Sequence, residues 1–105
     1  MTIFDKREEG FEKKYALDEE QKFKAQARRN RLLGLWVADK LGMSGEQASA
    51  YARVVVAADF EEAGAVVRKV MGDLTAKGIA LTETELRAKM DELMAMAIMQ
   101  VKAGT

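Results

Sequence analysis

The 105-residue sequence contains no proline, and this absence narrows the folds open to it more than any other feature. Proline is the strongest helix breaker, because its ring removes a backbone donor and clashes with the preceding helical turn. Good helix formers such as alanine, leucine, methionine, glutamate, lysine and arginine are abundant. We therefore expect an all-α protein, and a chain of this length is normally one domain with its own core.

Capping residues and glycines divide the chain into four expected helices. The first and longest begins at about Asp18, an N-cap followed by acids, and ends at Leu41 before Gly42. Ser44 and Gln47 have the spacing of a capping box, in which each residue bonds to the backbone of the other, and should start the second helix.

The third and fourth expected helices have different kinds of boundary signals. Asp59 is the expected N-cap of a third helix that ends at Gly78, although the second and third helices could also form one bent rod. Thr82 and Glu85 predict another capping box. The last helix carries one apolar stripe, formed by Leu86, Met90, Leu93, Ala97 and Val101. Short connections favour a compact four-helix bundle of the up-and-down type, with an irregular helical array as the alternative.

The sequence also lacks histidine and cysteine, which excludes most catalytic and metal-binding chemistry. Lysine plus arginine number 17, as do aspartate plus glutamate, so the zero net charge offers no bulk attraction to nucleic acid or an anionic membrane. No apolar run approaches the roughly 20 residues that a membrane-spanning helix needs. We expect a cytoplasmic protein that is no enzyme and has no metal and no cofactor.

Residues 1–17 are more polar than the rest and form an expected N-terminal arm. A helical rotation of about 100° per residue would place Phe4, Phe11 and Tyr15 on one narrow line. Gly10 lowers helix preference by about 1 kcal/mol relative to alanine. We interpret the arm as mobile or partly helical when free, and as gaining order in an apolar groove of a partner. The alternative is an ordinary first helix that folds back over the bundle.

Three stretches of the sequence belong together: FDKREEGFEKKYALDEEQKFKAQARRNRLLGLWVADKLG at 4–42, YARVVVAADFEEAG at 51–64 and RKVMGDL at 68–74. Together they resemble the alphaproteobacterial ATP synthase zeta subunit family. The combination of an F-D-x-R-E start, an ARRNRLLGLW block and a DFEEAG turn is specific. The similarity covers nearly the whole chain and loosens at AVVRKVM, residues 65–71.

The resemblance implies a four-helix bundle over residues 18–105 and an inhibitory arm over residues 1–17. The arm would block ATP hydrolysis by the catalytic head of the F-type ATP synthase, entering the cleft between a catalytic and a non-catalytic subunit near the rotor shaft as a helical wedge. Such an inhibitor would be peripherally associated with the membrane-bound synthase. The rings of the arm would be apolar anchors, and its charges would set register and specificity. The positions that match the arm of the family are Phe4, Asp5, Arg7, Glu8, Phe11, Glu12, Lys14 and Tyr15.

A basic cluster of Arg28, Arg29 and Arg31 is a candidate contact for phosphate groups, for example those of a nucleotide. Guanidinium groups match phosphate geometry with paired hydrogen bonds, but no glycine-rich phosphate loop accompanies them. The alternative is a solvated helix face paired with acids between residues 59 and 62.

Trp36 and four methionines also allow two interpretations. Trp36 lies on the apolar side of the first helix, where burial is expected and a partner surface is the alternative. We expect Met90, Met94, Met96 and Met99 to fill the core, although methionine also forms adaptable binding grooves.

Three rival functions remain open. A helix-turn-helix nucleic-acid module could use the turn at 41–44, but no basic recognition helix follows it. A small enzyme could pair carboxylates such as Asp59 with Glu62 or Asp91 with Glu92, which more often face water. A helical interaction or nucleotide-binding regulatory protein without ATPase inhibition is the third.

Overall fold

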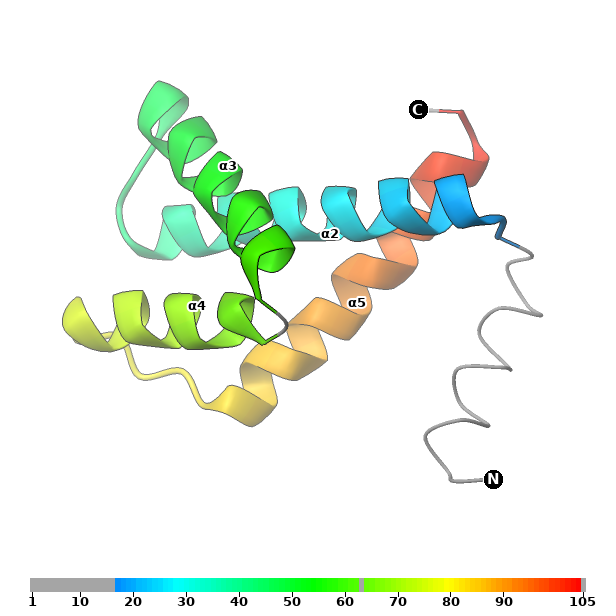
Figure 1. Cartoon of the computed structure of the whole chain (residues 1–105). Coiled ribbons are helices and arrows are strands. Elements are labelled where there is room, and N and C mark those ends of the chain that lie inside the picture. Colours follow the sequence, from blue (N-terminus) through cyan, green and yellow to red (C-terminus); the bar gives the residue numbers. More distant parts are fainter. Residues whose placement is uncertain (1–16, 63, 105) are drawn as a thin grey trace.

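The computed structural model describes residues 17–62 and 64–104, which fold into four helices (Figure 1). The helices are α2 (Glu19–Lys40), α3 (Gly45–Glu61), α4 (Ala65–Ala76) and α5 (Glu83–Lys102). The expected all-α class and the compact four-helix bundle are confirmed. Apart from Leu17, the expected arm lies outside the described residues.

Helix α2 is the centre of the arrangement, since it contacts each of the other three described helices. It packs most extensively against α3 and α5, and in Figure 1 α5 crosses it obliquely. Helix α4 packs mainly against α3. One hydrophobic core joins the four helices, and each contributes a fully buried side chain to it: Leu33, Val55, Val70 and Leu86.

Both ends of the chain's longest helix, α2, lie where the sequence predicts them. Asp18 is the N-cap: its Oδ1 accepts a hydrogen bond from the backbone N–H of Gln21 at 2.7 Å, and the Gln21 side chain accepts one from the Asp18 N–H. Leu41 is the C-cap, followed by Gly42 with a positive φ of 82°. The reciprocal hydrogen bonds between Asp18 and Gln21 satisfy two backbone donors that the first helical turn would leave unpaired.

The predicted capping box of α5 is also confirmed. The Thr82 side chain accepts from the Glu85 backbone N–H, and the Glu85 carboxylate accepts from the Thr82 N–H, both at 3.1 Å. The backbone hydrogen bond from Thr82, assisted by its hydroxyl, lowers the pKa of Glu85. A charged acceptor at this position also interacts favourably with the helix dipole.

The capping box predicted for Ser44 and Gln47 is wrong. Ser44 is the N-cap of α3, but its side chain makes no capping hydrogen bond. The next residue, Gly45, has a φ of 56°, so the chain enters α3 through a left-handed step. In a capping box, by contrast, the N-cap hydroxyl accepts a hydrogen bond from the backbone N–H of the third helical residue.

The predicted helix start at Asp59 is also wrong, because α3 continues through Asp59 to Glu61. The break comes instead at Gly64, whose φ of 82° separates α3 from α4, so the two helices are not one rod. Side chains of α2 explain the role of Asp59: its carboxylate accepts hydrogen bonds from Gln26 and Asn30 rather than capping a helix.

Helices α2 and α3 approach each other closely at Gly34. A Cβ atom built on Gly34 would lie 2.6 Å from the Cα of Ala52 and 3.1 Å from its Cβ. Real atoms of this kind do not come so close, so only glycine fits here without moving a helix. This contact sets the distance between the two helices that carry the surface features described below.

Candidate functional site

The three arginines of the predicted phosphate cluster do not face one site. Arg28 and Arg31 line an open groove of about 1030 Å³ along α2, together with Lys24 and Phe23. Arg29 does not line this groove, and its Nε donates a hydrogen bond to the Asn30 side chain at 2.8 Å. The phosphate contact stays a prediction, and within the described residues the groove brings together Arg28 and Arg31 but not Arg29.

Arg29 belongs to a polar network between α2 and α3. Asn30 is 1% exposed, and its Nδ2 donates to Asp59 Oδ2 at 2.9 Å. Gln26 Nε2 donates to the same oxygen at 2.6 Å. Burial lowers the pKa of Arg29, and the negative charges of Asp59 and Asp91 act against that shift. The electrostatic attraction of Arg29 to Asp59 agrees with one part of the alternative interpretation, the pairing of an arginine with an acid between residues 59 and 62, but Arg29 does not lie on a fully solvated face.

A pair of aromatic rings lies on the surface beside this network. Phe23 of α2 and Phe60 of α3 have ring centroids 5.4 Å apart and ring planes inclined by 51°. Phe23 is 57% exposed and Phe60 is 64% exposed. No pattern in the sequence predicts this pair, because the two residues are far apart in the chain and meet only when α2 and α3 pack.

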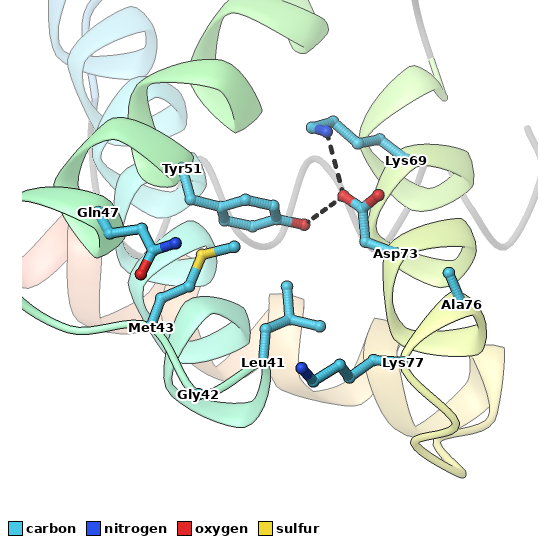
Figure 2. A pocket seen from close by; sticks show the side chains of 9 residues that line it. All are labelled: Leu41, Gly42, Met43, Gln47, Tyr51, Lys69, Asp73, Ala76 and Lys77. Atoms are coloured by element: carbon cyan, nitrogen blue, oxygen red, sulfur yellow. Dashed lines mark hydrogen bonds and ion pairs between the residues drawn. The ribbon is translucent and has the colours of Figure 1, made fainter.

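A second cavity, of about 500 Å³, lies between the turn after α2 and helix α4 (Figure 2). Tyr51 donates its hydroxyl hydrogen to Asp73 Oδ2 at 2.7 Å, and Lys69 Nζ lies 3.1 Å from the same oxygen. Burial raises the pKa of Tyr51, and the hydrogen bond to Asp73 adds to this. These three polar groups satisfy one another and join α3 to α4, which indicates a structural role.

Trp36 and the methionines divide between core and surface. Trp36 and Met90 are partly buried and pack against the core, as expected. The Nζ atoms of Lys40 and Lys89 lie 4.6 and 5.4 Å from the centroid of the Trp36 ring. Core burial is the wrong prediction for Met96, which is 44% exposed, and Met99, which is 65% exposed. On α5, Met96 lies beside the stripe that faces the core, and Met99 lies on the side away from it.

The structure describes none of the predicted arm contacts. All of them lie outside the described residues: Phe4, Asp5, Arg7, Glu8, Phe11, Glu12, Lys14 and Tyr15. The arm joins the bundle at Leu17 and Asp18, at the end of α2 that carries Phe23.

The described part of the chain contains no candidate metal site and no candidate membrane span. Over residues 17–62 and 64–104, no three acidic side chains gather as metal ligands would. None of the helices in these ranges has the length and apolar character needed to cross a bilayer.

Comparisons with known proteins identify the family. The family model described as ATPase inhibitor subunit zeta matches residues 1–100, a range that includes the arm and most of α5. A solution NMR structure of a protein 56% identical in sequence superposes with a TM-score of 0.68, over 79% of this chain and 96% of that chain. No curated protein matches. The chain belongs to the ATPase inhibitor subunit zeta family.

Proposed function

We propose that this chain inhibits ATP hydrolysis by the catalytic head of the F-type ATP synthase, and that residues 1–17 do so as a helical wedge. The observation that carries the proposal is the family match, which begins at residue 1 and therefore includes the arm. An inhibitor subunit is regulatory rather than catalytic, in keeping with a chain that has no histidine and no cysteine.

The proposed division of labour follows the two parts of the chain. Residues 18–105 form the bundle, and residues 1–17 form the arm that enters the cleft between a catalytic and a non-catalytic subunit near the rotor shaft. There Phe4, Phe11 and Tyr15 bury their rings, while the charges between them set the register. Catalytic subunits must change shape in each turnover, so a helix held in the cleft blocks hydrolysis without any chemistry of its own.

The proposed location is the cytoplasm, at the periphery of the membrane-bound synthase. The arm would hold the chain on the synthase head, so attachment to the membrane would be indirect.

A single cysteine placed in the arm tests where the arm lies. The natural sequence has no cysteine, so Lys13→Cys provides a unique thiol for a short photo-crosslinker. We expect crosslinks from position 13 to a catalytic subunit of the cognate head during ATP hydrolysis. The matched control is Lys77→Cys, at the exposed C-cap of α4. Crosslinks from position 13 to subunits outside the head, or equal crosslinking from both positions, would contradict the wedge model.

A further inference from the structure

The exposed rings of Phe23 and Phe60 are unusual for the surface of this bundle. Large aromatic side chains are normally buried in a core or an interface, because they carry the most apolar area. Here both rings are more than half exposed, although they touch each other. An aromatic pair left partly in water marks a candidate interaction surface.

The two rings are held in place before any partner arrives. Their 5.4 Å separation and inclined planes are a favourable aromatic geometry. One residue before Phe60, Asp59 ties α3 to α2 through hydrogen bonds from Gln26 and Asn30. A rigid pair of rings loses little conformational freedom on binding, which favours affinity.

The ring pair also lies near the point in the chain where the arm joins the bundle. Phe23 is eight residues after Tyr15, the last ring of the arm. Eight residues span at most about 27 Å when fully extended, and the helical segment from Glu19 to Phe23 shortens that reach. Any protein that holds the arm by Tyr15 is therefore near this pair of rings.

Positive charge borders the Phe23 ring on one side. Lys24, Arg28 and Arg31 line the same groove as Phe23. Protein interfaces commonly combine an apolar centre with a charged rim, and the rim charges steer the approach of an oppositely charged surface. The fitting partner surface is an apolar patch bordered by carboxylates.

We propose that Phe23 and Phe60 form a second docking surface, by which the bundle contacts the synthase head just outside the cleft that receives the arm. This inference rests on the proposed function, and it adds a site on the bundle to the contacts of the arm. The arm would block turnover, and the ring pair would lengthen the time the inhibitor stays bound. Most affinity differences at such contacts lie in the dissociation rate.

The double variant Phe23→Ala, Phe60→Ala in the full chain tests this surface. Hydrolysis by the cognate head is titrated with wild type and variant, and we expect the half-inhibitory concentration to rise about tenfold or more, as for loss of interface anchors. Saturating variant should still inhibit fully, since its arm is intact. Val54→Ala is the matched control, because Val54 is a half-exposed apolar residue of α3 that does not line the groove. It should leave the titration unchanged.

Other outcomes identify other occupants. An unchanged titration with the double variant would overturn the inference while the proposed function stands. A lower half-inhibitory concentration would mean that the rings hold the chain's own arm, and a wild-type dimer that the variant turns into a monomer in ultracentrifugation would mean that a second copy covers them. Either result overturns the proposal. Wild type that does not inhibit would overturn the proposed function itself. Thermal unfolding checks the variant, and Phe60→Ser alone serves if the double variant does not fold.

Discussion

Gly34→Ala should destabilise the bundle by about 1–2 kcal/mol, although alanine is the better helix former. The added methyl group would lie 2.6 Å from the Cα of Ala52, so α2 and α3 must move apart. Overpacking of this kind costs typically about 1–3 kcal/mol. The gain from replacing a helical glycine is roughly 0.5–1 kcal/mol and offsets only part of it. We expect a melting temperature lower by roughly 4–12 °C, which thermal unfolding by circular dichroism measures.

Gly72→Ala is the matched control, because it makes the same chemical change inside α4. Apart from its chain neighbours and the backbone of its own helix, no atom lies within 4 Å of the position that its Cβ would occupy. Without a clash, only the higher helix propensity of alanine acts. The free energy of unfolding of this variant should therefore rise by roughly 0.5–1 kcal/mol. A gain in stability for Gly34→Ala as well would show that the two helices do not touch at Gly34.

The double variant Phe11→Ala, Tyr15→Ala should raise the half-inhibitory concentration at least about 30-fold. Aromatic anchors in the centre of an interface each contribute about 2 kcal/mol or more when truncated, and 2 kcal/mol corresponds to about 30-fold in affinity. The bundle should unfold at the same temperature as wild type. The measurement is a titration of ATP hydrolysis by the cognate synthase head.

Lys13→Ala is the control for the anchors. On a helix, position 13 lies about 200° from both Phe11 and Tyr15, on the side opposite the rings. This substitution should change inhibition little. Unchanged inhibition by the double variant would remove the anchoring role of the rings, and an equal loss from Lys13→Ala would mean that charge rather than aromatic burial holds the arm.

The helix content and most helix ends were predictable, because they depend on local chemistry. The cap at Asp18, the box of Thr82 with Glu85 and the stop at Gly78 each involve residues within four positions of one another. Such interactions form in the same way wherever the helix packs.

The wrong helix start at Asp59 comes from a long-range contact, and the missing side-chain cap at Ser44 from a local conformation. Asp59 has the chemistry of an N-cap, but its carboxylate is used by Gln26 and Asn30 of another helix, 33 and 29 residues away. Ser44 fails as a side-chain cap because Gly45 takes a left-handed conformation that one sequence does not reveal.

The candidate site divides in the same way. Periodicity along residues 1–17 predicted an arm that binds a partner, and only the family resemblance indicated which partner. The ring pair of Phe23 with Phe60 and the separation of Arg29 from Arg28 both depend on how α2 meets α3. Neither feature has a signature in residue spacing along the chain.

The most direct test of the account is the rate of ATP hydrolysis by the cognate synthase head with the full chain and with a chain that begins at Asp18. We predict that the full chain suppresses hydrolysis and that the shortened chain leaves the rate unchanged. Circular dichroism should show that the shortened chain is folded. Equal suppression by both chains would contradict an inhibitory role for residues 1–17.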